Sequence, residues 1–459
     1  MTYHALGLFD RAEAHLADAA AIYQRVLGER DPSTLRAISA LSVNIVDLGK
    51  YSASEASIRS TLEVQRRVIG EEHLDTLKSM NNLGNVLWNQ ARYAEAEELY
   101  RKNLGIQRLV LGEEHRDTLL SMNNLAGTLK ERGSYAEAEE LYRKTLEVRR
   151  RVLGEEHPDT LISMNNLASV LGNQARYAEA EELFRKTLEV QRRVLGDEHP
   201  DTLASIGNLA LTLDSQARHS EAEELHRKTL EIQRRVLGGG HRDVLWSMNN
   251  LAESLENQGR YVEAEVLYRK TLEIQRDVLG EEHPDALLSM GNLGNVLSSQ
   301  GRYHESEELY RKTLEIMRRV LGDKHPFVAE SLYGLAAALE KMGRFADAEP
   351  LCREVESIRT SRLPAEHLAR KANDNLLGAI LCGLQRFSDA EPLLNGSYDA
   401  LGDAGGLSQQ DKREMLERLV RLYDSWDAAE PGKGYAQKAA AWREKLEELQ
   451  GTKAHRHGG

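Results

Sequence analysis

The feature that most constrains the fold is a period of 42 residues that runs through most of the 459-residue chain. The segment VLGEEHPDT at 152–160 returns as VLGDEHPDT at 194–202 and as VLGEEHPDA at 278–286. A chain with a fixed period of this length forms a stack of similar units, each packed against its neighbours. The histidines that mark this period are His73, His115, His157, His199, His241, His283, His325 and His367.

Each period contains two amphipathic helices. Apolar residues recur at helical spacing between Met164 and Leu171, and again between Ala178 and Leu188. Gly196 follows the second helix, at a position where glycine tolerates the left-handed backbone that ends many helices. Only nine prolines occur in the chain, and helix-favouring residues are abundant. The sequence therefore predicts an all-α, right-handed α-solenoid of about ten antiparallel helix pairs with a 42-residue period.

The period also predicts how the chain is divided. Near its C-terminal end Gly334 and Leu376 replace a recurring Asn, and Ser408 with Asp411 predicts the start of a capping helix. Because the array starts half a repeat in, we expect an apolar N-terminal edge through which the chain associates. The predicted segments are a partial first repeat (1–30), a regular array (31–323), degenerate repeats (324–402), a capping helix pair (403–450) and a disordered tail (451–459).

Composition and charge exclude several classes of function. The net charge of -13 argues against broad nucleic-acid binding. Two cysteines, Cys352 and Cys382, are too few for a disulfide framework or a metal knuckle. The chain contains no apolar run of about 18 residues and no leader segment. We therefore expect a cytoplasmic protein with no cofactor, no membrane partner and no nucleic-acid partner.

The histidine row has three interpretations: metal ligands, catalytic bases, or a joint between repeats. Stacked repeats place neighbouring histidines roughly 10 Å apart, whereas ligands of one metal lie within about 2.1 Å of it. Each histidine precedes the first helix of a repeat, where a ring nitrogen can meet a backbone group at the turn. His219 and His226 are two helical turns apart and have no obvious third ligand. We therefore predict a structural joint, no metal site, no catalytic residues and no enzymatic activity.

The unit HPDTLISMNNLASVLGNQARYAEAEELFRKTLEVQRRVLG at 157–196 resembles the tetratricopeptide repeat of kinesin light chains. The resemblance covers roughly residues 1–400 and implies a protein–protein interaction scaffold. The near-identical copies look more like bacterial relatives of that repeat, which are often fused to a Ser/Thr kinase or an NTPase. The alternative function is therefore a regulatory or substrate-docking region of such an enzyme, with the catalytic domain outside this chain.

In arrays of this family the first helix of each pair lines the concave side, which implies a groove for an extended peptide. An Asn stands just before the anchor Leu of the first helix in six repeats, and residues beside it vary. Constant amides could bond a peptide backbone while the varied residues select its side chains. The alternative is that each Asn bonds the adjacent helix and holds the stack. The predicted peptide-binding residues are Asn82, Asn124, Asn166, Asn208, Asn250, Asn292, Asn123, Asn165, Asn249, Trp88 and Trp246.

Overall fold

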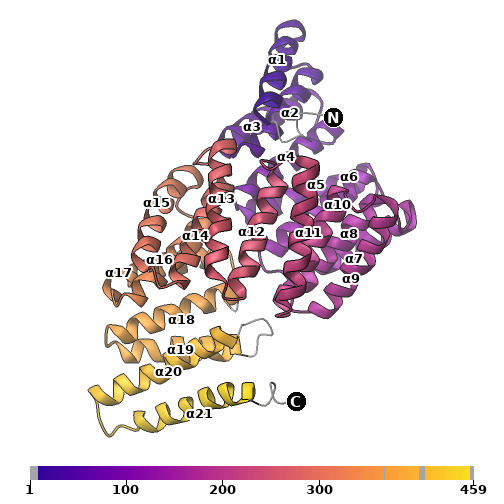
Figure 1. Ribbon diagram of the computed structural model, residues 1–459. Coiled ribbons are helices and arrows are strands. Elements are labelled where there is room, and N and C mark those ends of the chain that lie inside the picture. The colour runs from indigo at the N-terminus through magenta and orange to yellow at the C-terminus, as the bar shows by residue number, and fades with distance from the viewer. Residues whose placement is uncertain (1–8, 366, 403–408, 455–459) are drawn as a thin grey trace. The chain divides into compact units, whose positions relative to one another are not determined.

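The computed structural model describes residues 9–365, 367–402 and 409–454, and within these ranges every regular element is a helix (Figure 1). The first helices of the repeats are α2 (Pro32–Asp47), α4 (Leu74–Asn89), α6 (Arg116–Glu131), α8 (Pro158–Asn173), α10 (Pro200–Ser215), α12 (Arg242–Asn257), α14 (Pro284–Ser299), α16 (Pro326–Lys341) and α18 (Leu368–Gly383). The second helices are α1 (Phe9–Leu27), α3 (Tyr51–Val68), α5 (Tyr93–Val110), α7 (Tyr135–Leu153), α9 (Tyr177–Val194), α11 (His219–Leu237), α13 (Tyr261–Leu279), α15 (Tyr303–Leu321), α17 (Phe345–Thr360) and α19 (Phe387–Gly402). The helices α20 (Gln409–Ala429) and α21 (Tyr435–Ala454) follow the array. This confirms the predicted all-α solenoid of helix pairs.

The histidine row forms the N-caps of the first helices. In each case Nδ1 of the histidine accepts a hydrogen bond from the backbone N–H two residues later, as His157 does from Asp159 at 3.1 Å. The cap satisfies one of the backbone donors that a helix leaves unpaired at its start. The predicted role as a joint is therefore confirmed. The same bond is made by His73, His115, His199, His241, His283, His325 and His367.

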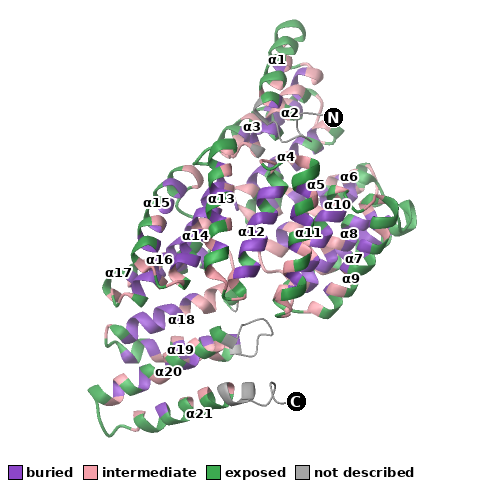
Figure 2. Ribbon diagram, in the orientation of Figure 1, coloured by how far each residue is buried: buried purple, intermediate pink, exposed green. Residues whose placement is uncertain are grey.

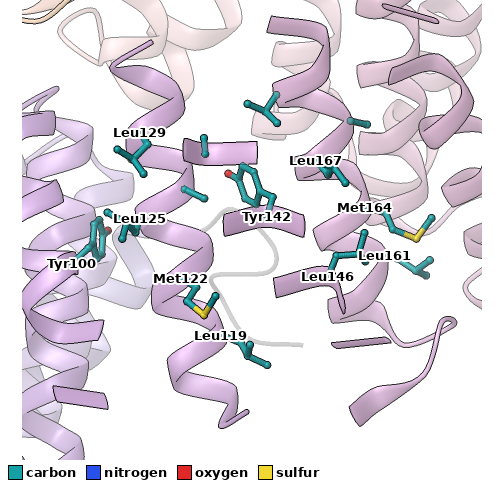
Figure 3. Close-up of a cluster of buried hydrophobic side chains, with 14 of the residues drawn as sticks. Tyr100, Leu119, Met122, Leu125, Leu129, Tyr142, Leu146, Leu161, Met164 and Leu167 are labelled. Atoms are coloured by element: carbon teal, nitrogen blue, oxygen red, sulfur yellow. The ribbon is translucent and has the colours of Figure 1, made fainter. Parts of the chain in front are cut away.

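The core is a row of apolar layers between the helix pairs. Figure 2 shows buried positions as bands that alternate with exposed positions along the helices. In Figure 3, Leu119, Met122 and Leu125 of α6 lie between Tyr100 of α5 and Tyr142 of α7. All five side chains are at most 4% exposed. Each Å² of apolar surface buried in this way stabilises the fold by roughly 25 cal/mol.

The chain divides into two compact units, Met1–Ser289 and Met290–Gly459. Within the first unit, consecutive first helices from α2 to α12 contact one another, whereas consecutive second helices have at most sparse contacts. A gap of about 760 Å³ opens between α7 and α9, lined by Leu146, Arg150, Glu182 and Lys186 among others. Because the first helices are packed more closely than the second helices, they form the inner, concave side of this unit.

In the second unit α20 and α21 pack against each other, and α20 packs on α18 and α19. The Trp426 ring stacks on that of Tyr435 with centroids 4.1 Å apart. Helix α21 continues to Ala454, so the prediction of a disordered tail was wrong for residues 451–454. One glycine, Gly451, costs a helix only about 1 kcal/mol and did not end it. Ser408, residues 1–8 and residues 455–459 lie outside the described residues, so what the sequence indicates about them stays a prediction.

Candidate functional site

The inner face of the first unit consists of parallel rows, with one residue from each first helix in every row. An apolar row contains Leu120, Ile162 and Trp246, whose side chains are 44%, 37% and 53% exposed. The second row, four residues further along each helix, holds the predicted Asn residues; we call it the amide row. Residues four apart share one face of a helix. The amide row of this unit contains Asn82, Asn124, Asn166, Asn208 and Asn250.

A pocket of about 300 Å³ opens on this face between α4, α6 and α8. It brings together four residues predicted from the sequence: Trp88, Asn123, Asn124 and Asn166. Trp88 is 38% exposed and makes an edge-on contact with Tyr93, with ring centroids 6.1 Å apart. The complete lining is Asn85, Trp88, Tyr100, Asn123, Asn124, Gly127, Lys130, Glu131, Tyr142 and Asn166.

Part of the amide row is already bonded within the protein. The Asn124 side-chain amide donates to Oδ1 of Asn81 in the preceding repeat at 3.2 Å. The Asn166 amide donates to Oδ1 of Asn123 at 2.7 Å. These bonds join consecutive repeats, as the stacking alternative predicts.

The Asn residues one position earlier also connect repeats. The Asn165 amide donates to Oγ of Ser205 in the next repeat at 2.5 Å. Asn249 and Ser289 exchange hydrogen bonds at 2.9 and 3.2 Å. Asn249 is only 6% exposed. These side chains therefore hold the stack rather than reach into the groove.

The other three members of the amide row have no such bond. Among the residues that the structure describes, the side chains of Asn82, Asn208 and Asn250 make no hydrogen bond to another residue, and the same is true of Asn292 in the second unit. For Asn250 the reason is local, because Gly207 stands where Asn81 and Asn123 accept the corresponding bonds in earlier repeats. Asn250 is 9% exposed, and Asn208 is half-buried. The amide row thus contains both stacking amides and free amides.

A group of ionisable residues lies where α10, α11 and α12 meet; the sequence pointed to His219 and His226 but not to the carboxylate of Asp214 beside them. Oδ1 of Asp214 lies 2.9 Å from Nδ1 of His219 and accepts a hydrogen bond from Ser254 at 3.0 Å. Nε2 of His226 lies 3.6 Å from Oδ2 of Asp214. Burial and the nearby Asp214 carboxylate raise the pKa of Glu253, although its side chain reaches solvent on the inner face. The available signal was His226 and His219 in places that other repeats give to aromatic rings.

Two general features concern the described part of the chain. No group of three or more His, Cys, Asp or Glu side chains in it is arranged to hold a metal ion. None of its helices combines the length and the apolar character that crossing a membrane requires.

Several solved structures resemble the chain. The nearly identical TPR-like repeats of a putative kinesin light chain from Podosopora anserina are 30% identical, with 45% of this chain and 98% of that chain covered and a TM-score of 0.38. BtubC (BKLC) from P. vanneervenii is 20% identical, with 50% and 92% covered and a TM-score of 0.40. A Rap protein complexed with competence and sporulation factor is 12% identical, with 84% and 99% covered and a TM-score of 0.49. No curated protein matches the chain.

Family models match the chain from its first repeat onward. Residues 1–33 match one model of the tetratricopeptide repeat. A second model of the same repeat matches residues 41–108, 79–151, 117–182, 159–235, 218–277, 243–311 and 290–361. These matches span well over half of the chain and follow its helix pairs, so the chain belongs to the tetratricopeptide repeat family.

Proposed function

We propose that the inner face of the first unit binds an extended segment of a partner protein. The tetratricopeptide repeat architecture fits a protein–protein interaction scaffold. The observation that carries the finer proposal is the pairing of free amides at Asn208 and Asn250 with exposed apolar side chains on the same helices. An extended peptide presents backbone groups that need partners at regular intervals, and apolar side chains between them.

The apolar row supplies the contacts that would favour binding. Trp246 is 53% exposed, which is unusual for a large aromatic side chain that no partner covers. Trp and Tyr dominate the binding energy of many protein interfaces because they bury a large area with few rotatable bonds. Ile162 lies on the same row two repeats away. A segment that contacts both residues must cross α10 and its free Asn208.

The stacking bonds of Asn124 and Asn166 provide a matched control for a test of this proposal. Peptides would be selected from a phage-displayed library of random 12-residue sequences on the full chain, and their Kd measured by fluorescence anisotropy. Changing both Asn208 and Asn250 to Ala removes two contacts worth about 0.5–1.5 kcal/mol each. We expect the affinity to fall roughly 5- to 150-fold, with a nearly unchanged melting temperature.

For the double variant Asn124→Ala and Asn166→Ala we expect the opposite result. It removes bonds between repeats, so the melting temperature should fall while the folded protein keeps most of its affinity for peptides that contact α10 and α12. If the Asn208 and Asn250 variant binds the selected peptides as tightly as the unchanged protein, the amide row is not the binding site. A library that yields no peptide competing along this face contradicts the proposal as a whole.

A further inference from the structure

The side chains along the inner face change charge between α6 and α12. Lys130 of α6 and Asp214 of α10 occupy the same position in their repeats. Glu253 of α12 occupies the position that is Asn85 in α4. We call Asp214 and Glu253, together with His219 and His226, the acidic corner. Ser254, the neighbour of Glu253, donates to Asp214 and so brings the two carboxylates onto one site.

The carboxylates of the acidic corner lack the cation that acidic residues have elsewhere in the array. Glu139 accepts hydrogen bonds from both Arg143 and Arg176, and Glu181 forms the matching pair with Arg218. Within the described residues the only ion-pair partners of Asp214 are His219 and His226, and Glu253 has no ion pair. The described part of the chain therefore places these two acidic groups on the inner face without a paired lysine or arginine.

His226 supplies an independent observation. Its side chain is 1% exposed, and its Nε2 has no hydrogen-bond partner among the described residues. The nearest acidic atom, Oδ2 of Asp214, lies 3.6 Å away, which is too far for a normal hydrogen bond. Buried polar groups without a partner are costly and rare in folded proteins. This nitrogen lies nearest to Oδ2 of Asp214, whereas Ser254 and His219 contact Oδ1 of the same carboxylate.

The local side-chain pattern of α10 and α11 differs from that of α4 and α5. In α4 and α5 the Tyr100 hydroxyl donates to Oδ1 of Asn85 at 2.5 Å. At the corresponding positions of α10 and α11 stand Leu211 and His226, which cannot form this bond. The tyrosine-to-amide bond is thus replaced by a histidine that faces a carboxylate. Acceptors outnumber donors at this point, so a donor-rich, positively charged group would complete it.

We propose that the acidic corner binds the positively charged side chain of an arginine or lysine in the partner segment. This rests on the proposed function, since the segment that crosses α10 and α12 would carry that side chain. A guanidinium group offers five N–H donors and pairs with carboxylates in a two-bond geometry, and an ammonium group offers three donors. Either group would place one positive charge beside Asp214 and Glu253 and donate hydrogen bonds to their carboxylates.

The test uses small probes on the full chain, so that it does not need the natural partner. N-acetyl-arginine amide is titrated into protein labelled with ¹³C-histidine, and the imidazole signals of His219 and His226 are followed by NMR. The control probe is N-acetyl-citrulline amide, which has nearly the same shape and no charge. We expect saturable shifts with arginine and an affinity for citrulline at least tenfold weaker. N-acetyl-lysine amide should shift the same signals.

Substitutions show which residues the arginine-induced shifts depend on. Asp214→Asn keeps the oxygen that His219 and Ser254 contact, and Glu253→Gln changes a side chain that reaches solvent; together they should abolish the shifts. Lys130→Gln, at the other end of the groove, should leave arginine binding unchanged. If the Asp214 variant has a lowered melting temperature, Glu253→Gln alone should still weaken the binding of N-acetyl-arginine amide at least threefold. Equal shifts with citrulline, or shifts that survive both acidic changes, overturn the proposal.

Failure here can be separated from failure of the proposed function. Selected peptides that need Asn208 and Asn250 but no basic residue would leave the peptide groove standing and refute the acidic corner. Arginine binding that depends on Asp214, in a protein that selects no groove-binding peptide, would support the corner and refute the groove.

Discussion

At the scale of single residues, some repeated positions cap the start of a helix and others form hydrogen bonds between repeats. Each histidine of the row is an N-cap whose Nδ1 accepts a backbone N–H, and this explains its recurrence without a ligand. Histidine is an unusual cap, because Ser, Thr, Asp and Asn are the residues most favoured there. Its neutral imidazole offers one acceptor nitrogen in the place where those residues offer an oxygen.

A cap of this kind has a measurable cost when it is removed. His157→Ala should lower the free energy of unfolding by about 0.5–2 kcal/mol, whereas His157→Asn should keep most of it because the Asn oxygen can accept the same N–H. Urea denaturation of the three proteins gives both values. Adding a chelator should change none of the midpoints, and a large drop with chelator would instead indicate a structural metal.

At the scale of helices and their pairs, the array depends on close crossings and on ion pairs between repeats. A Cβ added at Gly84 would lie 2.6 Å from Cε1 of Tyr100, so α4 and α5 touch where glycine leaves room. On the outer side Glu139 of α7 is held by Arg176, which follows α8, at 2.8 Å. The same bond between repeats recurs as Glu181 with Arg218.

The crossing predicts opposite effects of one substitution at two glycines. Gly84→Ala should destabilise the protein by about 1–3 kcal/mol, because the methyl group overpacks against Tyr100. Gly105→Ala places a methyl group in open space on the exposed side of α5, and should stabilise the helix by about 0.5–1 kcal/mol. Thermal melting of both variants checks this. Equal effects would mean that α4 and α5 are not packed as described.

The ion pairs predict a dependence of stability on pH. Burial alone would raise the pKa of Glu139, but hydrogen bonds from Arg143, Gln174 and Arg176 lower it from 4.5 to about 2. Since the pKa is lower in the folded protein, the stabilisation is present above about pH 4.5 and is lost as the pH falls towards 2. Glu139→Gln should therefore lower the urea midpoint at pH 7 and have little effect near pH 2.

A control for this prediction is Glu182→Gln, which breaks an exposed ion pair with Lys186 on α9 itself. Pairs of this kind contribute about 0–1 kcal/mol, so the midpoint should move little at pH 7. If the urea midpoints of the two variants change equally between pH 7 and pH 2, the ion pair between repeats stabilises the protein no more than the exposed pair does.

At the scale of the whole chain, stability is expected to be close to a sum over repeats and their contacts with neighbours. Deleting residues 135–176, one full period of 42 residues, joins Ser134 to Tyr177 in register. The shortened chain should fold with the same helical content per residue and melt at a somewhat lower temperature. Circular dichroism during heating measures both.

The contrasting deletion removes residues 141–176 and breaks the period by six residues. The apolar stripes of the fused helices would then face different directions, so we expect loss of cooperative melting or aggregation. Cooperative melting of both shortened chains would show that the period is not needed for packing.

The sequence alone determined the fold, most of the helix pairs and the role of the histidine row. Each of these depends on periodicity, since apolar residues at helical spacing fix which side of a helix is buried. The capping role of His157 also needs only local geometry, because its bond spans two residues.

Only the tertiary structure decided which amides form hydrogen bonds between repeats and which do not. Asn124 and Asn250 occupy the same place in the repeat, but Asn124 bonds Asn81 while Asn250 faces Gly207 across the same interface. The partner of such a side chain stands 43 residues away in the sequence, on another helix, and its own bonds decide whether it can accept. The same holds for the acidic corner, where three helices bring Asp214, His226 and Glu253 together. A repeat pattern gives the position of a side chain, whereas its hydrogen-bond partner depends on residues that only packing places beside it.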